Sequence, residues 1–520
     1  MLIPDWLARR QALSPERVAL IDQARGGREI TYRAWNRIVN RSARFLLSAA
    51  SLRKGERVAV LSKNNTEYLD VLFACQKTGA ILSALNWRLT VHELTAIVAD
   101  AAPAALVYGP GFESAVAAIA ASPAARSIRR FIAIGEPAGE GHLSFAAREA
   151  MSDDPPPPVE LREDDPWVLC STGGSTGLPK AAILTHGNIL WNAVNTVVSW
   201  GLRPDDVAIL DAPLFHTGGI NVFTAPLVYH GGTSIVCAGF DGDLFYDLLA
   251  SGRPTVYFGV PTMFLALQEH ARFAGADFSR LRIVISGGAP CPEPIFRRFW
   301  DRGVDFKTGY GLTEAGPNTF WLPPAEVRNK PGAVGYPLFH VDVRVVDSDG
   351  RDLGPGEVGE LWVRGPHVCK GYWNRPEESA AAIVDGWLRT GDLAVRDADG
   401  AFTIVGRKKD VIISGGENIY PAEVESVLAG HPAISEAALI GAPDPKWGEI
   451  GVAVVVVRPG ATLGEEEVVS HCRAHLARYK VPRRVIFTDA LARTGAGKVD
   501  KRALQARFAE PASAPAPAMG

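Results

Sequence analysis

The sequence contains little that would place it among disulfide-rich, zinc-binding or nucleic-acid-binding proteins. Its 520 residues include only six cysteines, and neither a C-x-x-C pair nor a histidine cluster accompanies them. This distribution argues against a disulfide framework and a structural zinc site, and it fits a reducing compartment. The formal net charge is only −3 and no long basic run occurs, so nothing favours nucleic acid as a partner. A small-molecule ligand is the better expectation.

Long hydrophobic stretches and internal repeats are also missing. The first residues, MLIPDWLARR, carry an aspartate and two arginines where a secretory signal would need an unbroken apolar run. No segment approaches the roughly 20 apolar residues of a membrane-spanning helix, and no fixed period indicates a solenoid or propeller. We therefore expect a soluble, cytoplasmic protein with a layered architecture and no integral membrane segment.

What the sequence does contain is a recurring alternation of short apolar strands and amphipathic helices. Residues 55–86 read as strand, helix and strand, and the same rhythm returns several times up to about residue 310. Such alternation predicts an α/β fold with parallel sheets covered by helices and ligand sites at the carboxyl ends of the strands. From about residue 335 the pattern changes to short strands with Asp-Gly turns, which predicts a small antiparallel, β-barrel-like subdomain.

The chain is too long for one hydrophobic core, so we expect more than one domain. Residues 1–408 are predicted to form a large N-terminal domain. Residues 409–508 would form a small α+β C-terminal domain. Residues 509–520, with their alanines and prolines, have the composition of a disordered tail.

The segment STGGSTGLPK, residues 171–180, concentrates glycines and hydroxyl side chains before a proline and Lys180. Such a stretch is either a flexible turn or a polyphosphate-binding loop, because small residues let successive backbone N–H groups face one anion. Its lysine lies too far from the last glycine for a Walker motif. The loop directly follows an apolar strand and precedes a helix start, which favours the phosphate-binding interpretation.

Three further segments carry candidate functional residues. In TGYGLTEAG, residues 308–316, Tyr310 can lie against a flat ligand while Thr313 and Glu314 face a phosphate and its Mg²⁺. In the segment from RTGD to GRKKD, Asp392 can accept hydrogen bonds from both hydroxyls of a ribose. In ARTGAGKVDKR a lysine stands between glycine and valine. Each segment alone is weak, since turn carboxylates and surface lysines are common.

Together and in this order, the segments resemble the adenylate-forming superfamily, which contains AMP-forming acyl-CoA synthetases, luciferases and peptide synthetase adenylation domains. The resemblance covers roughly residues 10–505 and rests on STGGSTGLPK, YGLTE, RTGD, GRKKD, SGGENIYPAEVE and GKVDKR. It implies an enzyme, an AMP-forming acid:CoA ligase. Such an enzyme activates a carboxylic acid with ATP and Mg²⁺ to an acyl-adenylate and then transfers the acyl group to coenzyme A.

The resemblance also implies roles for individual residues. The loop for the β- and γ-phosphates would comprise Thr172, Gly173, Gly174, Ser175, Thr176, Gly177 and Lys180. Adenine would be bordered by Gly288, Ala289, Pro290, Thr308, Gly309, Tyr310 and Gly311. Asp392 and Arg407 would hold the ribose. The catalytic candidates are Lys498, which would bridge the substrate carboxylate and the α-phosphate, Thr313, Glu314 as the metal ligand, and His216.

For the second half reaction the resemblance implies a swing of the C-terminal domain about a hinge at Lys409. The swing would withdraw Lys498 and bring the SGGEN loop to a tunnel for the pantetheine arm. The CoA-binding candidates are Ser414, Gly415, Gly416, Glu417, Trp447 and Tyr479. The last two, both aromatic, have ordinary packing as an equal alternative.

The acyl pocket is assigned to His216, Asn221, Val260, Pro261, Gly287 and Gly311. In amino-acid-activating relatives the segment around LFHTGG carries an aspartate that pairs with the substrate ammonium, whereas this chain has Phe215 and His216. Because an unpaired buried ammonium is costly, we expect a carboxylic acid without a charged amine. His216 resembles a gate between acyl pocket and CoA tunnel, with a core histidine as the alternative.

Several alternatives stay open at this level. The apolar pocket segments suit a fatty or an aromatic acid. A stand-alone adenylation enzyme that loads a separate acyl carrier protein, or a luciferase-like oxygenase, would show the same motifs. A non-catalytic nucleotide-binding protein is disfavoured because Lys498, Glu314 and Asp392 are all present. The oligomeric state is also open, with a homodimer as one option.

Overall fold

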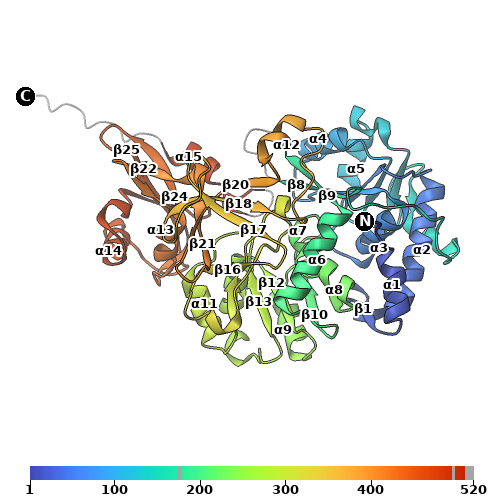
Figure 1. Cartoon of the computed structure of the whole chain (residues 1–520), viewed down its shortest axis with the longest axis horizontal. Coiled ribbons are helices and arrows are strands. Elements are labelled where there is room, and N and C mark those ends of the chain that lie inside the picture. Colours follow the sequence, from blue (N-terminus) through green and yellow to red (C-terminus); the bar gives the residue numbers. More distant parts are fainter. Residues whose placement is uncertain (173–178, 495–497, 510–520) are drawn as a thin grey trace, which may run out of the picture.

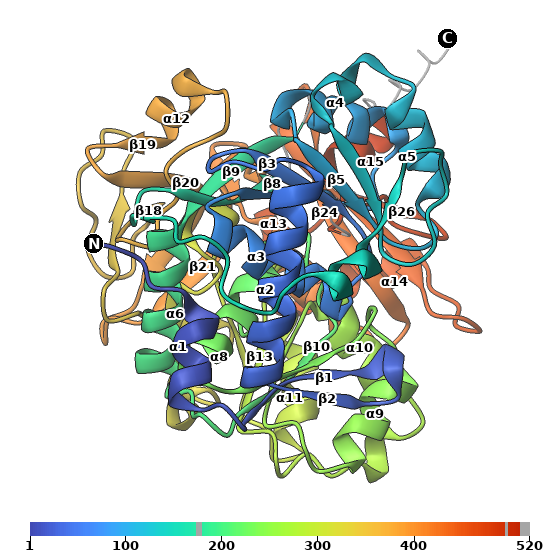
Figure 2. The same ribbon diagram turned by 90° about the vertical axis from the view of Figure 1, so that its right-hand side faces the viewer.

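The computed structural model describes residues 1–172, 179–494 and 498–509. Four β-sheets organise these residues, and helices cover them (Figures 1 and 2). The first three sheets and their helices form the larger part of the molecule, and the fourth lies with its helices at one end of the long axis in Figure 1. The predicted α/β architecture with a small C-terminal unit is confirmed. Within the described ranges no helix is both long and apolar enough to cross a membrane.

The first sheet has the strand order β7-β6-β5-β3-β4-β8-β9, and only β9 is antiparallel to its neighbour. Its strands are β3 (Arg57–Leu61), β4 (Ile81–Ala84), β5 (Ala105–Tyr108), β6 (Arg130–Ala133), β7 (Leu143–Ser144), β8 (Pro166–Thr172) and β9 (Lys180–Thr185). The helices of this part of the chain are α1 (Trp6–Leu13), α2 (Tyr32–Ala49), α3 (Thr66–Thr78), α4 (Val91–Ala101), α5 (Glu113–Ala120), η2 (Pro123–Ser127) and η3 (Phe145–Ala150). The βαβ unit predicted over residues 55–86 is β3-α3-β4.

The second sheet has the order β14-β13-β12-β10-β11-β1-β2, and only β2 is antiparallel. Its strands are β1 (Val18–Asp22), β2 (Arg28–Thr31), β10 (Val207–Leu210), β11 (Thr233–Val236), β12 (Val256–Gly259), β13 (Ile283–Ser286) and β14 (Phe306–Thr308). The accompanying helices are η1 (Gln23–Arg25), α6 (His186–Trp200), α7 (Thr217–Asn221), α8 (Thr224–His230), α9 (Gly242–Ala250), α10 (Pro261–Glu269), η4 (Phe273–Gly275) and α11 (Glu293–Trp300).

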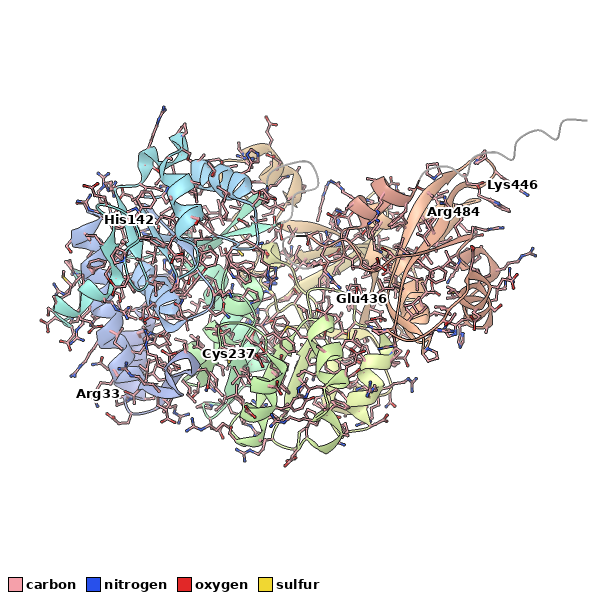
Figure 3. All side chains as sticks on the ribbon, turned by 180° about the vertical axis from the view of Figure 1, so that it is seen from behind. Arg33, His142, Cys237, Glu436, Lys446 and Arg484 are labelled. Atoms are coloured by element: carbon pink, nitrogen blue, oxygen red, sulfur yellow. The ribbon has the colours of Figure 1, made fainter. Side chains whose placement is uncertain are left out.

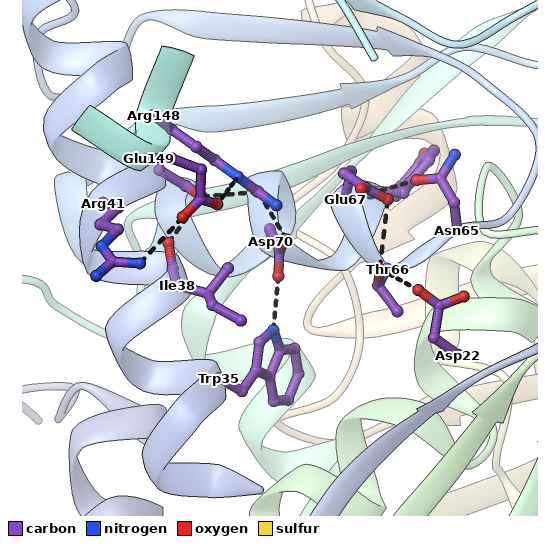
Figure 4. Close-up of polar contacts among 12 residues, drawn as sticks. Asp22, Trp35, Ile38, Arg41, Asn65, Thr66, Glu67, Asp70, Arg148 and Glu149 are labelled. Atoms are coloured by element: carbon purple, nitrogen blue, oxygen red, sulfur yellow. Dashed lines mark hydrogen bonds and ion pairs between the residues drawn. The ribbon is translucent and has the colours of Figure 1, made fainter. Parts of the chain in front are cut away.

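The two parallel sheets share one hydrophobic core, to which α1, α2, α3, α6 and α8 also contribute. Trp35, Phe73 and Trp167 meet there edge to face, with ring centroids 5.0 and 5.7 Å apart. A polar network crosses this region (Figure 4): buried Asp70 accepts hydrogen bonds from Trp35 Nε1 at 2.8 Å and from Arg148 at 2.7 Å. Because the carboxylate is paired and hydrogen-bonded, it can lie inside the core.

The third sheet is antiparallel, with the order β15-β16-β21-β20-β18-β17 and β19 beside β20. Its strands are β15 (Phe320–Trp321), β16 (Ala333–Pro337), β17 (Asp342–Val346), β18 (Val358–Arg364), β19 (Ile383–Val384), β20 (Trp387–Arg396) and β21 (Phe402–Arg407), with η5 (Thr313–Ala315), η6 (Pro324–Glu326) and α12 (Pro376–Ala382) in the same region. The predicted Asp-Gly turns are present, with φ of +81° at Gly350 and +91° at Gly400, values that favour glycine.

The fourth sheet has the order β23-β22-β25-β24, with β26 beside β25. Its elements are β22 (Ile412–Ser414), β23 (Glu417–Ile419), α13 (Pro421–Ala429), β24 (Ile434–Asp444), β25 (Gly448–Val457), α14 (Glu465–His475), η8 (Arg478–Lys480), β26 (Arg484–Phe487) and α15 (Lys501–Phe508), joined to the third sheet through η7 (Lys408–Asp410). It has hydrophobic clusters of its own. The boundary at residue 408 stays a prediction, and residues 510–520 of the predicted tail lie outside the described residues.

Candidate adenylation site

The carboxyl ends of the second sheet bring the adenine candidates together. In parallel register Gly259 pairs with Ser286 and Ser286 with Thr308, so the loops after β13 and β14 start side by side. Gly309 N–H donates to the Ser286 carbonyl at 2.6 Å. A Cβ on Gly309 would lie only 2.7 Å from the Ile285 side chain, and Gly288 has φ of +81°. These two glycines therefore let the backbone take a path that other residues would obstruct.

The ribose candidates meet across neighbouring strands of the third sheet. Asp392 in β20 is directly opposite Arg407 in β21, and their charged groups lie 3.2 Å apart. The buried Asp392 carboxylate also accepts a hydrogen bond from Tyr310 Oη at 2.6 Å. Burial raises the pKa of Asp392, while the Arg407 guanidinium opposes that shift. A buried, oriented carboxylate beside an aromatic ring is suited to a nucleoside.

Lys498 of the C-terminal unit lies within electrostatic reach of Arg407, Asp392 and Glu314. Its own segment is held by a hydrogen bond from Thr494 N–H to the Lys498 carbonyl at 2.8 Å, and Arg493 pairs with Glu436 at 2.7 Å. The Lys498 side chain is solvent-accessible, yet the protein around it partly desolvates the ammonium and lowers its pKa, to which Arg407 adds, against the opposing charges of Asp392 and Glu314. The structure therefore brings together the lysine and both carboxylates that the sequence prediction assigned to the site.

Glu314 occupies η5, immediately after the loop that carries Tyr310. Its Oε1 accepts a hydrogen bond from Tyr372 Oη at 2.9 Å, and its carbonyl accepts one from Cys369 N–H at 2.7 Å. The side chain is half-buried, and among the described residues no donor contacts its Oε2. One half-buried carboxylate with an available oxygen can serve as a Mg²⁺ ligand, since this ion takes its other ligands from phosphates and water. Thr313, next to Glu314, is buried.

The predicted phosphate loop connects two antiparallel strands. Sequence reasoning placed it after an apolar strand and before a helix start, and the structure places one more strand between the loop and that helix: Lys180–Thr185 form β9, with Thr172 opposite Lys180, and α6 begins at His186. Residues 180–185 therefore complete a ladder with β8 before the helix starts. The Lys180 ammonium lies 5.4 Å from the centre of the Tyr372 ring and 3.8 Å from Glu378. Gly173, Gly174, Ser175, Thr176 and Gly177 lie outside the described residues.

His216 caps the start of α7. Its Nδ1 accepts a hydrogen bond from Gly218 N–H at 3.1 Å, which assigns the proton of the neutral ring to Nε2. Burial lowers the pKa of His216 to about 4, and the positive charges of Lys498 and Arg88 act in the same direction. His216 is therefore a neutral imidazole within the electrostatic reach of Lys498.

One acyl-pocket candidate, Gly287, lies against an aromatic residue that sequence reasoning missed. Phe258, half-buried at the end of β12, stands between Gly218 and Gly287: a Cβ on either glycine would lie 3.1 Å from its ring. Asn221, the last residue of α7, is buried and donates to Thr217 Oγ1 at 3.1 Å. Val260 and Pro261 follow at the start of α10. A Cβ on Gly311 would lie 2.2 Å from the Pro317 carbonyl, so glycine is required there.

The CoA candidates lie elsewhere. Ser414, Gly415, Gly416 and Glu417 form the tip of the β22–β23 hairpin, where Gly415 N–H donates to the Trp447 carbonyl at 2.7 Å. Gly415, with φ of +61°, presses against the Trp447 ring, and a Cβ there would lie 2.8 Å from it. Figure 3 shows Lys446, which precedes Trp447, at the end of the molecule remote from the larger part.

Among the described residues no hydrogen bond or ion pair joins the hairpin tip to residues before Lys408. Tyr479 in η8 is partly exposed, and Lys409 in η7 is exposed at the junction of the third and fourth sheets. This arrangement therefore brings Lys498 within electrostatic reach of Asp392 and Glu314, whereas the hairpin tip makes no such contact with the larger part.

Tyr372 is the second residue that sequence reasoning missed. It lies in CKGYWNRPEE, a segment without any recognised catalytic pattern, and only the packing of that segment beside β9 brings it to Glu314 and Lys180. A tyrosine after a glycine was the one available signal, and it is too common to be informative.

Comparison with known proteins places the chain in a family. The model of the AMP-binding enzyme family matches residues 7–373, and that of the AMP-binding enzyme C-terminal domain matches residues 423–498. A feruloyl-CoA synthase from an Amycolatopsis species is 44% identical, with 97% of this chain and 98% of the relative covered. An indoleacetate–CoA ligase from Aromatoleum aromaticum is 38% identical, with 96% and 97% covered.

A solved structure also allows the overall arrangement to be compared. ATP-bound MatB from Rhodopseudomonas palustris superposes with a TM-score of 0.88 at 34% identity, covering 97% of this chain and 99% of that one. Superposition on the apo structure of MatB gives a TM-score of 0.76, so the overall arrangement of this chain is closer to the ATP-bound form. With both family models matched and relatives aligned over nearly the whole length, the chain belongs to the AMP-binding enzyme family, as one of its adenylate-forming acid:CoA ligases.

Proposed function

We propose that this enzyme, an AMP-forming ligase that uses ATP, Mg²⁺ and CoA, converts an aromatic carboxylic acid into its CoA thioester. The observation that carries the assignment of its site is the position of Lys498. This lysine belongs to the C-terminal unit, yet it stands within electrostatic reach of Asp392, Glu314 and His216 on the larger part. No local sequence pattern requires that meeting.

In the first half reaction a carboxylate oxygen of the acid attacks the α-phosphorus of ATP, and the bond to the bridging oxygen breaks so that pyrophosphate leaves. A carboxylate cannot acylate a thiol directly, because oxide would have to be the leaving group. The step is governed by positioning and by stabilisation of charge on the phosphate oxygens. Asp392, paired with Arg407, would accept from the ribose hydroxyls. Lys498 would approach both the acid carboxylate and the α-phosphate.

Mg²⁺, held by Glu314 and phosphate oxygens, would supply further positive charge. Lys180, next to the loop that lies outside the described residues, would contact the leaving pyrophosphate. Gly288, Ala289, Pro290, Thr308, Gly309 and Gly311 would border the adenine with Tyr310.

The second half reaction requires a different face of the C-terminal unit. The CoA sulfur attacks the acyl carbonyl, AMP leaves, and the thiol proton must be lost. We propose that the unit turns about Lys409, withdrawing Lys498 and bringing the exposed Gly415–Gly416 tip to the cleft. Trp447, which supports that tip, and Tyr479 would then contact CoA. The neutral ring of His216 is suited to line the passage for pantetheine.

The acid is proposed to be aromatic because Phe258 offers a half-buried ring between two glycines at the carboxyl ends of the strands. Aromatic rings pack well against one another in offset or edge-to-face geometry. The relatives named for feruloyl-CoA and indoleacetate are 44% and 38% identical, whereas the long-chain-fatty-acid–CoA ligase FadD13 of Mycobacterium tuberculosis is 34% identical. A fatty acid is the second candidate.

A panel of aromatic and fatty acids, each supplied with Mg·ATP, is the direct test. We expect pyrophosphate exchange with an arylpropenoic or arylacetic acid, and AMP and thioester only after CoA is added. Exchange without thioester, together with transfer to an acyl carrier protein, would favour a carrier-loading enzyme instead. Phe258→Ala should lower kcat/KM for the best aromatic acid about tenfold and affect fatty acids less. Phe339→Ala, which changes a phenylalanine that is 78% exposed, is the matched control.

Lys498→Ala should abolish pyrophosphate exchange while ATP still binds, because the lysine acts on the reacting groups more than on the nucleotide. Lys501→Ala is its control, since Lys501 lies three positions away and pairs with Glu425 at 2.7 Å. Unchanged exchange in Lys498→Ala would refute the assignment. A cytoplasmic location is proposed from the six free cysteines, and a homodimer stays an option that sedimentation can test.

A further inference from the structure

The segment CKGYWNRPEE, residues 369–378, crosses from Glu314 to Lys180, and we refer to it as the strap. Its backbone runs beside β9: Lys370 N–H donates to the Ile183 carbonyl at 3.0 Å, and Trp373 N–H donates to the Ala181 carbonyl at 2.8 Å. At its start, Cys369 N–H donates to the Glu314 carbonyl at 2.7 Å. The strap is therefore attached to both the metal-site residue and the strand that carries the phosphate-site lysine.

Tyr372 makes the side-chain connection within the strap. Its hydroxyl donates to Glu314 Oε1 at 2.9 Å, and its ring centre lies 5.4 Å from the Lys180 ammonium. The backbone around it is held as well, because Tyr372 N–H donates to Ser379 Oγ at 2.8 Å. Gly371, with φ of +123°, would place a Cβ 2.7 Å from that same oxygen. The ring position is thus determined by the strap and α12.

The two contacts of Tyr372 have different physical effects. A hydrogen bond to one oxygen of a carboxylate fixes the direction of the other oxygen, so Glu314 Oε2 is oriented while it stays available. The ring face attracts the ammonium and holds it near the cleft without neutralising it. Glu378, 3.8 Å from Lys180, contacts the same ammonium from α12. One side chain therefore contacts both an anionic and a cationic group.

We propose that Tyr372 is a positioning residue for Mg·ATP, which holds the Glu314 carboxylate and the Lys180 ammonium at the spacing that a metal-bound triphosphate requires. This inference rests on the proposed roles of those two residues in metal and phosphate binding. Tyr372 itself contacts neither the reacting carboxyl nor the α-phosphorus in the proposal. Its hydroxyl acts through Glu314, and its ring acts through Lys180.

Two substitutions separate these actions. Tyr372→Phe keeps the ring and removes the hydroxyl, so we expect the Kd for ATP in Mg²⁺ to rise about tenfold or more, while the Kd for ATP in EDTA changes less than about threefold. Tyr372→Leu also removes the ring and should weaken ATP binding in EDTA as well. Titration calorimetry on the full chain measures both constants. Tyr336→Phe is the matched control, because Tyr336 donates to Glu326 Oε2 at 2.7 Å outside the site.

A kinetic readout distinguishes positioning from a general structural role. Tyr372→Phe should raise the Mg²⁺ concentration needed for half-maximal pyrophosphate exchange, while conversion of preformed acyl-adenylate and CoA to thioester should keep its wild-type rate. If that second rate falls in parallel with exchange, Tyr372 is structural and the proposal is overturned. Equal ATP affinities for Tyr372→Phe and wild type in Mg²⁺ would overturn it too.

Variants of Glu314 and Lys180 distinguish a failure of the positioning role of Tyr372 from a failure of the proposed metal and phosphate roles. If Glu314→Gln and Lys180→Ala weaken Mg·ATP binding and Tyr372→Phe does not, the positioning role alone is wrong. If neither Glu314→Gln nor Lys180→Ala changes Mg·ATP binding, the proposed metal and phosphate roles are wrong as well.

Discussion

Replacing Asp211 with asparagine is expected to stabilise the protein at neutral pH. Asp211 directly follows β10 and is buried, and its Oδ1 has no hydrogen-bond partner among the described residues. Its Oδ2 accepts from Tyr257 Oη at 3.1 Å. Burial raises the pKa of Asp211 to about 7, against the opposing effect of the hydrogen bonds from Tyr257 and the backbone. The ionised form is therefore unfavourable in the folded chain.

The magnitude follows from the difference between the folded pKa and the ordinary value of 3.8. Between these two values the folded chain keeps a proton that the unfolded chain has released, so the free energy of unfolding falls as the pH rises and levels off above about pH 7. The full difference corresponds to about 4 kcal/mol, which is an upper bound for the gain in Asp211→Asn. The amide can still accept from Tyr257 and carries no charge.

Urea unfolding followed by tryptophan fluorescence, from about pH 5 to about pH 8, measures this effect. The stability difference between Asp211→Asn and wild type should grow by about 1.4 kcal/mol per pH unit up to about pH 7 and then stay constant. Asp205→Asn, which makes the same change at an exposed aspartate just before β10, should show no such slope. A difference that is the same at the acid and alkaline ends would refute the reasoning.

Three further substitutions test the site. In Gly219→Ala the new Cβ would lie 2.3 Å from the Pro213 carbonyl oxygen, whereas in the control Gly239→Ala it would have no atom within 4 Å. We expect a lower melting temperature and a higher KM for the acid in Gly219→Ala and neither change in Gly239→Ala. Burial lowers the pKa of His216 to about 4, so its titration should not affect kcat/KM near pH 6.5. An inflection near pH 6.5 that is present in the wild type and absent in His216→Asn would contradict the neutral ring. Asp392→Asn should raise the Kd for ATP about tenfold by calorimetry, and an unchanged Kd would exclude the ribose role.

Much of the chemistry could be predicted from local patterns. Alternation of apolar strands and helices predicted the parallel sheets, and Asp-Gly pairs predicted the turns at Gly350 and Gly400. The motifs led to Asp392, Arg407 and Tyr310, which the structure brings into contact with one another, and to Glu314. Local patterns did not show that a strand lies between the phosphate loop and α6, because apolar residues 181–184 are compatible with a strand or a helix until their pairing with β8 is known.

The amino-acid sequence by itself determined which groups are present and which backbone segments carry them, since periodicity and turn chemistry depend on near neighbours in the chain. Only the tertiary structure decided that Lys498 lies within electrostatic reach of Asp392 and Glu314, that Tyr372 connects Glu314 with Lys180, and that Phe258 stands between two glycines. Distances between such groups follow from how sheets and domains pack. That packing is a property of the whole chain, which no short window of sequence contains.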